Sequence, residues 1–302
     1  LMNKGFGYLS YEDNAQPVSI NSIYDVASLT KILATAPVIM KLIQNNRLEL
    51  NYPLSQFYNE YKTEDKNNIT IRHLLTHTSG LEAFREYYKI EDINREKIIH
   101  NIINQDLVYK PDSSEIYSDL GMILLLDIIE KISNSSLDKL ADKYIYKPMG
   151  MNNTTFNPIE YDISNIAPTE NDDYFRKQLL VGLVHDENAF ILNGVSGHAG
   201  LFSNASDIGI FCKMLIDEGN YLGTRYFKSD LINKFTKRQN IILGSDRALI
   251  WDTPSQNGRS SAGDYFSNLS YGHLGFTGTS VWSDPEDDII VVLLTNRVYP
   301  TR

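Results

Sequence analysis

The chain has 302 residues, of which 42% are hydrophobic, so it can bury a sizeable core in one or two domains. Its formal net charge is −10 and its lysines and arginines are scattered along the sequence, which argues against a nucleic-acid partner. No apolar run approaches the roughly 20 residues that a membrane-spanning helix needs.

The first predicted elements are a strand over 1–10 and a long helix that begins at or just before Ser28. Ser28 and Lys31 fall on one face of the first turn of this helix, within reach of each other. The N–H groups at that helix end favour an anion, and burial would lower the pKa of the lysine. The S-x-x-K pair therefore predicts a serine nucleophile with a lysine base, and a capping serine beside a surface lysine is the alternative. The helix is indicated by apolar residues at helical spacing: Leu29, Ile32, Leu33, Ala36, Ile39, Met40 and Ile43.

The middle of the chain has mostly helical patterning and loops. Tyr117-Ser118-Asp119 stands just ahead of a helix, where Ser118 or Asp119 could simply cap it. A polar loop over 152–173 has little periodicity, and we expect it to border a cleft. His185-Asp186-Glu187 is typical of a solvated turn, and a place in the site is the alternative. The helices predicted here span 96–103, 120–132 and 137–146.

The last part of the chain is predicted to form strands. His273-Leu274-Gly275 lies in a glycine-interrupted strand that continues through Val281-Trp282, and its glycines would let the backbone approach a ligand closely. A turn over 284–287 leads into a buried strand over 289–294. Strands at both ends and helices between them predict an α/β (α+β) chain, with an antiparallel β-sheet flanked by helices. Its sheet domain is split over 1–52 plus 193–302, and an all-helical domain over 53–192 is inserted.

Several other kinds of site are disfavoured. The single cysteine, Cys212, lies in an apolar helical run and is expected to be a buried small hydrophobe. His73 and His77 have the spacing of a zinc helix, but Leu74 stands where H-E-x-x-H needs a glutamate, so no metal is predicted. No cofactor is predicted either. The absence of G-x-S-x-G excludes the α/β-hydrolase route to an esterase.

Taken in order, the motifs at Ser28, Tyr117 and His273 resemble those of the serine β-lactamase and penicillin-binding protein superfamily. The resemblance is to its class C β-lactamase-related branch of DD-peptidases, esterases and D-amino-acid amidases. It covers nearly the whole chain and implies a β-lactamase/transpeptidase-like fold. Further matching segments are 25–31, 71–81, 148–151 and 194–203.

The resemblance implies roles for matching residues. Ser28 would be the acylated nucleophile, Lys31 its partner in proton transfer, and Tyr117 the relay of a proton to the leaving group. The N–H groups of Ser28 and Phe276 would form the oxyanion hole. Substrate binding would involve Gly275, Thr277 and Arg297.

Two departures from the family pattern bear on the chemistry. Asp119 stands at an asparagine position, and its carboxylate would tend to keep Lys31 charged. His273 stands at the lysine position of K-T-G and would carry little charge at neutral pH, so a substrate carboxylate would be anchored more weakly. Arg297 or Arg302 is the alternative cation.

The predicted function is that of a serine hydrolase that forms an acyl-enzyme, with D-alanyl cell-wall peptides or β-lactams as acyl donors. A carboxylesterase or D-amino-acid amidase is the alternative, because weak carboxylate anchoring widens the range of substrates. The second alternative is a catalytically silent module of a larger cell-wall glycosidase, such as a β-N-acetylglucosaminidase. The resemblance implies a small-molecule or peptide substrate and a periplasmic or exported location. We expect the chain to be a fragment that lacks N- and C-terminal elements.

Overall fold

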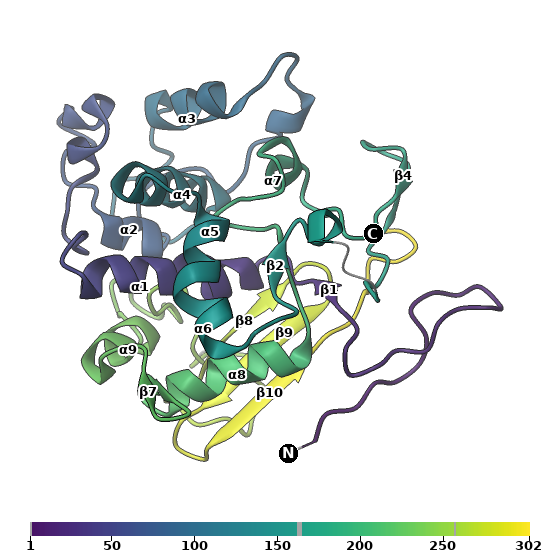
Figure 1. The fold of residues 1–302 in the computed structure, drawn as a ribbon. Coiled ribbons are helices and arrows are strands. Elements are labelled where there is room, and N and C mark those ends of the chain that lie inside the picture. The colour runs from purple at the N-terminus through teal and green to yellow at the C-terminus, as the bar shows by residue number, and fades with distance from the viewer. Residues whose placement is uncertain (1, 162–164, 257) are drawn as a thin grey trace.

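The computed structural model describes residues 2–161, 165–256 and 258–302 (Figure 1). It is a mixed α/β structure with antiparallel sheets, as predicted. The helices are α1 (Ala36–Gln44), α2 (Ile71–Leu75), α3 (Arg95–Asn104), α4 (Asp119–Ser133), α5 (Leu137–Ala141), α6 (Lys147–Met149), α7 (Glu187–Ile191), α8 (Ala205–Ile216) and α9 (Ser229–Thr236). The strands are β1 (Tyr24–Asp25), β2 (Thr155–Phe156), β3 (Asn171–Asp172), β4 (Gln178–Leu179), β5 (Leu201–Ser203), β6 (Asn220–Tyr221), β7 (Thr224–Arg225), β8 (Tyr271–Gly275), β9 (Thr279–Asp284) and β10 (Ile289–Leu293).

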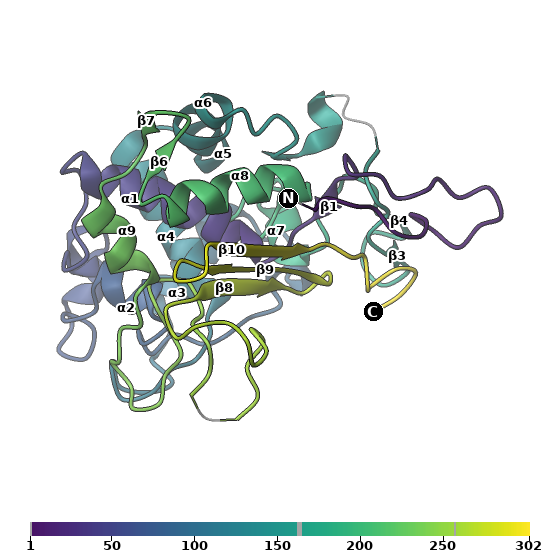
Figure 2. The same ribbon diagram turned by 90° about the horizontal axis from the view of Figure 1, so that it is seen from below.

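The main sheet has the strand order β10-β9-β8, and both pairs are antiparallel. Helix α8 lies along one face of it (Figure 2). The prediction of one strand running from 271 through Trp282 was wrong. Gly278 takes a φ of +102° and donates its N–H to the carbonyl of Gly275 at 3.0 Å, so the chain turns back and forms a hairpin.

The predicted strand over 1–10 was also wrong for the described residues. Tyr8 makes an isolated bridge to Pro17, and Leu9 donates its N–H to the carbonyl of Gln16 at 2.9 Å. The segment therefore folds back on itself as a loop that extends away from the main sheet (Figure 1). An apolar stretch without a neighbouring strand to pair with does not form a regular ladder.

The helix that follows Ser28 is longer than α1 alone. It opens at 29–30, widens into a π-helical stretch over Lys31–Thr35, and continues as α1. Pro37 has no N–H to donate to the preceding turn, which accounts for the change of helix type at this point. Ser28 therefore lies at the N-terminal end of the helix, as predicted.

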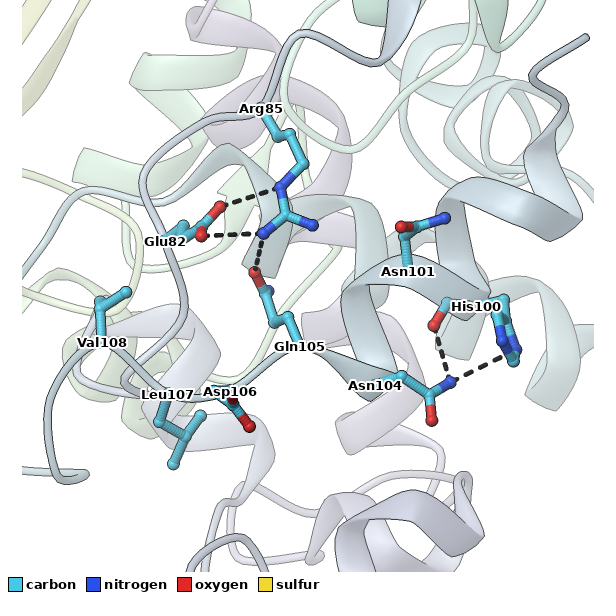
Figure 3. Close-up of a pocket in the computed structure, with 9 residues that line it drawn as sticks. All are labelled: Glu82, Arg85, His100, Asn101, Asn104, Gln105, Asp106, Leu107 and Val108. Atoms are coloured by element: carbon cyan, nitrogen blue, oxygen red, sulfur yellow. Dashed lines mark hydrogen bonds and ion pairs between the residues drawn. The ribbon is translucent and has the colours of Figure 1, made fainter. Parts of the chain in front are cut away.

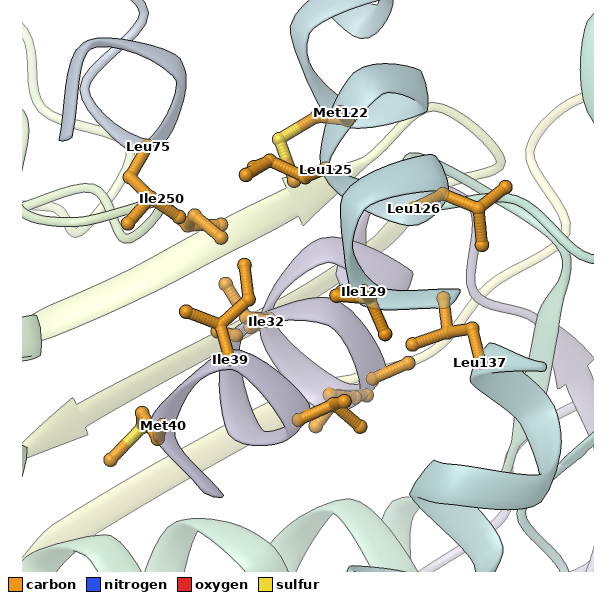
Figure 4. Packing of buried hydrophobic residues seen from close by; sticks show 14 of the residues in the cluster. Ile32, Ile39, Met40, Leu75, Met122, Leu125, Leu126, Ile129, Leu137 and Ile250 are labelled. Carbon is orange, nitrogen blue, oxygen red and sulfur yellow. The ribbon is translucent and has the colours of Figure 1, made fainter. Parts of the chain in front are cut away.

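Helix α4 packs beside the Ser28 helix in the largest hydrophobic cluster. Ile32 and Ile39 of the Ser28 helix and Leu125 and Ile129 of α4 all belong to this cluster (Figure 4). The predicted helices over 96–103 and 120–132 are confirmed as α3 and α4, whereas 137–146 is α5 followed by a π-helical stretch over Asp142–Tyr146. The cluster contains residues from both predicted domains, 1–52 plus 193–302 and 53–192. The division into two domains stays a prediction.

The remaining sequence expectations fall on loops and on α8. Cys212 is fully buried in α8, and burial raises the pKa of its thiol to about 12, which makes it a packing residue as predicted. The polar loop over 152–173 carries β2, β3 and a short helix over Pro158–Tyr161, and its residues 162–164 lie outside the described residues. Within the part that the structure describes, no helix is long and apolar enough to cross a membrane.

The core predicts a strong contrast between two leucines. Leu125 is fully buried, so Leu125→Ala should lower the free energy of unfolding by about 2–5 kcal/mol through lost burial and the cavity left behind. Leu243 is fully exposed, and Leu243→Ala should change the free energy of unfolding by less than about 0.5 kcal/mol. Urea unfolding followed by circular dichroism measures both. Equal effects would contradict the placement of α4 in the core.

Candidate active site

The centre of the site is the buried ammonium group of Lys31. Its Nζ lies 2.9 Å from Ser28 Oγ, 2.8 Å from Asp119 Oδ1 and 3.0 Å from the backbone oxygen of His198. The lysine is 0% exposed, whereas Ser28 is partly exposed. The first and second predicted motifs are thus brought together around one nitrogen.

Helix capping places Asp119. Ser118 is the N-cap of α4, and its Oγ accepts the N–H of Gly121 at 3.2 Å. Asp119 is the first residue of the helix, and its own N–H donates to the carbonyl of Ala83 at 2.8 Å. The capping interpretation of this motif therefore holds for Ser118 and leaves the Asp119 side chain to face Lys31.

The charge of Lys31 follows from this pairing. Burial opposes the charged form, but the Asp119 carboxylate and the adjacent Tyr117 outweigh it, and the pKa of Lys31 lies above its ordinary value. The lysine is therefore an ammonium in the resting state, as the substitution of aspartate for asparagine predicts. The Ser28 hydroxyl oxygen and the His198 carbonyl accept hydrogen bonds from Nζ, and the Asp119 carboxylate forms an ion pair with it.

Tyr117 lies among two cations and two imidazoles. Lys31 Nζ is 4.8 Å from its ring centre and the Arg247 guanidinium carbon is 5.2 Å from it. The His77 ring is 4.7 Å away and the His273 ring 5.9 Å away. The hydroxyl of Tyr117 is buried and forms no hydrogen bond of good geometry with a described group, although it lies near enough to Lys31 to help raise the pKa of that lysine.

His273 is a neutral hydrogen-bond acceptor. Burial, and then the charges of Lys31 and Arg247, lower its pKa to about 3. Its Nδ1 lies 2.7 Å from the backbone oxygen of Leu274, so Nδ1 carries the proton and donates it. Its buried Nε2 has a lone pair and no partner among the described groups. The third motif therefore presents an acceptor where relatives with K-T-G present a cation.

His77 supports Tyr117 from the other side. Its Nδ1 accepts the N–H of Ser118 at 3.1 Å, and its own backbone adopts a φ of +59°. Burial, and then the charge of Arg247, lower its pKa well below the ordinary value, so it is neutral. The sequence brings His77 into consideration only for a zinc site, because of its spacing from His73. It does not predict that His77 packs beside Tyr117. No group of three His, Cys, Asp or Glu side chains in the described residues could hold a metal ion.

The expected oxyanion hole has two free donors. In the bonds between described residues, the N–H groups of Ser28 and Phe276 have no acceptor. Gly275 packs so tightly that an added Cβ would lie 2.6 Å from the carbonyl oxygen of Val26, so the end of β8 sits directly against the segment before Ser28. The buried Thr277 donates its hydroxyl to the Asp25 carbonyl at 2.7 Å. Gly275 and Thr277 thus hold the two donors in place.

Asp25 fixes the chain on the other side of Ser28. Its carboxylate is buried and accepts the N–H of Ala27 at 2.8 Å and that of His185 at 2.7 Å. Ala27 has a φ of +45°, which is a strained conformation for a residue with a side chain. Burial raises the pKa of Asp25 despite these bonds. The strained turn presents Ser28 at the helix start.

The expectation of a solvated turn at 185–187 was wrong. His185 is 4% exposed and Glu187 6% exposed. The His185 ring stacks on Phe276 at 5.7 Å, and its Nε2 lies 2.8 Å from Glu170 Oε2. Asp186 lies 2.9 Å from the ring of His198. The turn is therefore part of the support of the site.

Comparison with known proteins identifies the family. The sequence model of the Beta-lactamase family matches residues 1–302. The chain belongs to the beta-lactamase family. A Salmonella agona protein named as a D-alanyl-D-alanine carboxypeptidase is 31% identical over 336 aligned residues, which cover 99% of this chain and 76% of that protein.

Solved structures share the beta-lactamase-family fold. An octameric penicillin-binding protein homologue from Pyrococcus abyssi matches with a TM-score of 0.75 and 25% identity, over 98% of this chain and 67% of that one. A penicillin-binding protein homologue from Caulobacter crescentus gives 0.76 at 15% identity, over 96% and 81%. EstCE1, described as a hydrolase with promiscuous acyltransferase activity, gives 0.73 at 20% identity, over 96% and 84%.

Two arginines of this beta-lactamase-family chain were predicted as alternative cations. The exposed Arg297 lies with its guanidinium carbon 4.8 Å from the centre of the Phe276 ring and forms no ion pair with a described carboxylate. Arg302, in contrast, pairs with Glu170 and lies 3.0 Å from Glu187. Of these two arginines, Arg297 is the one without a carboxylate partner among the described residues.

A separate polar hollow lies outside this site (Figure 3). Its volume is about 470 Å³, and Arg85 in its wall is paired with Glu82 at 2.8 Å and contacts Gln105 at 3.3 Å. None of the predicted site residues lines it. The lining residues are Glu82, Arg85, His100, Asn101, Asn104, Gln105, Asp106, Leu107 and Val108.

The pairing at the centre of the site predicts a pKa change. Asp119→Asn removes the carboxylate that keeps Lys31 charged, so the pKa of Lys31 should fall. Titration of the lysine Cε signals by NMR, with Lys31 assigned by Lys31→Arg, measures it. Asp127→Asn is the matched control, because Asp127 lies on the same helix and pairs with Lys131 instead. An unchanged Lys31 pKa in Asp119→Asn would contradict the pairing.

Proposed function

We propose that this chain is a serine hydrolase that forms an acyl-enzyme on Ser28, with D-alanyl cell-wall peptides or β-lactams as acyl donors. The observation that carries the proposal is the line of contacts from Ser28 Oγ to Lys31 Nζ at 2.9 Å and on to Asp119 Oδ1 at 2.8 Å. Membership of the beta-lactamase family supports it. The name of the Salmonella relative supports the peptide substrate class.

The geometry suggests how the serine is activated. A charged lysine cannot accept a proton, but Lys31 can pass one proton to Asp119 and take the Ser28 hydroxyl proton in its place. The Oγ–H bond of Ser28 breaks, an O–H bond forms on Asp119, and Lys31 remains an ammonium. The serine oxygen then attacks the acyl carbon.

The other groups would serve the later part of acylation. The N–H groups of Ser28 and Phe276 stabilise the oxyanion, since neither has another described acceptor. The bond between the acyl carbon and the leaving nitrogen then breaks. As it breaks, the proton held by Asp119 returns through Lys31 and the Tyr117 hydroxyl to that nitrogen. The neutral Nε2 of His273 can accept the hydrogen bond of this hydroxyl and orient it.

A carboxylesterase or D-amino-acid amidase is the second candidate. It is favoured by the neutral state of His273, which leaves the third motif without a cation for a substrate carboxylate. The exposed Phe276 beside the oxyanion hole offers an apolar contact to an acyl group. The fold shared with EstCE1 is compatible with this activity.

Two finer proposals concern the parent protein. We infer an exported or periplasmic location, because D-alanyl wall peptides lie outside the cytoplasmic membrane. A fused cell-wall glycosidase domain, such as a β-N-acetylglucosaminidase, remains a proposal that the sequence resemblance alone supports. In such a fused protein, this chain could be a module without catalytic activity, and the experiment below distinguishes that alternative from an enzyme.

The acyl-enzyme is tested by intact-protein mass spectrometry. Wild type should gain the mass of one penicillin, and Ser28→Ala should not, because the nucleophile is absent. A parallel reaction with a fluorophosphonate, together with an assay of penicillin hydrolysis, separates the candidates. Fluorophosphonate labelling without a penicillin adduct or penicillin turnover favours the esterase or amidase. No adduct and no turnover with either reagent would contradict an enzyme and favour the silent module.

The free cation predicts a substrate preference. If Arg297 anchors the substrate carboxylate, Arg297→Gln should raise KM about tenfold for a D-alanyl peptide with a free carboxyl end, because a charge-assisted bond is lost. The amidated peptide should be unaffected. Arg225→Gln is the control, since Arg225 lies on the exposed strand β7 and contacts only backbone oxygens. A loss that is equal for both peptides would contradict the role of Arg297.

A further inference from the structure

The third acceptor of Lys31 is a backbone carbonyl, and its position depends on an unusual set of contacts. The oxygen belongs to His198, in the loop between α7 and β5. The next carbonyl back, that of Gly197, accepts the hydroxyl of Thr35 at 2.7 Å. An added Cβ at Gly197 would lie 2.2 Å from the backbone oxygen of Met122, so this peptide is packed directly on α4. The loop is therefore attached to both helices of the site.

The His198 side chain is held at both ring nitrogens. Nδ1 lies 2.8 Å from Ser196 Oγ, and Nε2 lies 2.9 Å from Asp186 Oδ1. His198 is 1% exposed and Ser196 is 0% exposed, so neither bond competes with bulk water. Because both nitrogens of the His198 ring are held, the backbone carbonyl of His198 has little freedom to move.

Asp186 connects this ring to the rest of the support. It is the N-cap of α7, and its Oδ1 also accepts the N–H of Ala189 at 2.7 Å. Burial opposes its ionisation, but the charge and hydrogen bond of His198, the Ala189 N–H and the charge of Lys31 outweigh burial and lower its pKa. Asp186 thus ties the His198 ring to the start of α7, and it lies within electrostatic range of Lys31.

The chemistry of Lys31 shows why a fixed carbonyl matters. A carbonyl and a carboxylate only accept hydrogen bonds, so they occupy two of the three N–H directions of the ammonium. The remaining direction is the one toward Ser28 Oγ. When Lys31 passes a proton to Asp119, the lone pair left on Nζ faces Asp119, and rotation about the Cε–Nζ bond turns it toward Ser28, whose hydroxyl can then donate its proton. The His198 carbonyl accepts one N–H throughout this rotation, so a carbonyl that moved away would leave the amine free to turn its lone pair away from the serine.

We propose that His198 and Asp186 are positioning residues for Lys31, in which the clamped His198 ring sets its own carbonyl as an acceptor and thereby directs the lysine toward Ser28. This inference rests on the proposed roles of Ser28 and Lys31. It makes the turn at 185–188 a supporting element of the reaction, although no residue of that turn touches the substrate in the proposal.

The test uses two variants of the full chain and one matched control. His198→Ala removes the clamped ring. Asp186→Asn removes only the charge, because asparagine still caps α7 and still accepts from His198. Glu187→Gln is the control, since Glu187 is a buried carboxylate of the same turn that pairs with Arg302 and not with His198.

The first readout is the rate at which a fluorophosphonate labels Ser28 from pH 6 to 10, followed by intact mass. In His198→Ala the rate should fall about tenfold or more while the final labelling still reaches one adduct per chain. In Asp186→Asn the rising part of the pH profile should move to lower pH, since one anion near Lys31 is gone. The charged or titratable groups that face Lys31, namely Asp119, Tyr117, His77 and His273, are unchanged in both variants.

The second readout does not depend on activity. Asp186→Asn should lower the pKa of Lys31, measured by NMR of the lysine Cε, whereas Glu187→Gln should not. If wild type is not labelled, the proposed function fails, and the Lys31 pKa still decides whether Asp186 acts on the lysine. The inference would be overturned if the labelling rate, the pH profile and the Lys31 pKa of the two variants all equalled those of wild type. A loss in His198→Ala that appears only as incomplete final labelling would also overturn it, because that indicates misfolding.

Discussion

A single buried positive charge organises this structure. An unpaired ammonium in a protein interior costs several kcal/mol, so Lys31 is tolerated only where acceptors surround it. Its acceptors come from three distant parts of the chain: its own helix start, the first residue of α4, and the loop before β5. The same contacts that offset the cost of burying this charge also bring together the groups to which the proposed function assigns proton transfer.

Around that charge, most of the supporting residues act through the backbone. Asp25 holds the strained turn at Ala27, and the tight packing of Gly275 on the Val26 carbonyl brings the end of β8 against the segment that leads to Ser28. In the proposed function the N–H groups of Ser28 and Phe276 form an oxyanion hole, whose donors must be fixed before the reaction, and the side chains of Asp25 and Thr277 hold the segments that carry them. The neutral His273 leaves the third motif without a positive charge of its own, and in the proposed function this weakens the anchoring of a substrate carboxylate.

The sequence predicted the parts of the site that are local and missed those that depend on long-range contacts. Ser28 and Lys31 are three residues apart on one helix turn, and Asp119 follows a capping serine, so spacing alone indicated their geometry. His198 contacts Lys31 across 167 residues of sequence, and no periodicity announces such a contact. The strand predicted through Trp282 failed for a similar reason, since the turn depends on the positive φ of Gly278.

The inert thiol of Cys212 has a practical consequence for following motion in this molecule. It is the single cysteine of the chain, and its burial within α8 leaves it protonated and out of reach of thiol reagents. A cysteine introduced at an exposed position, such as Phe84 beside the Ala83 carbonyl that anchors α4, would then be the one site open to a maleimide dye. Spectroscopic labels can thus be placed on the loop that anchors α4 without first removing a native residue.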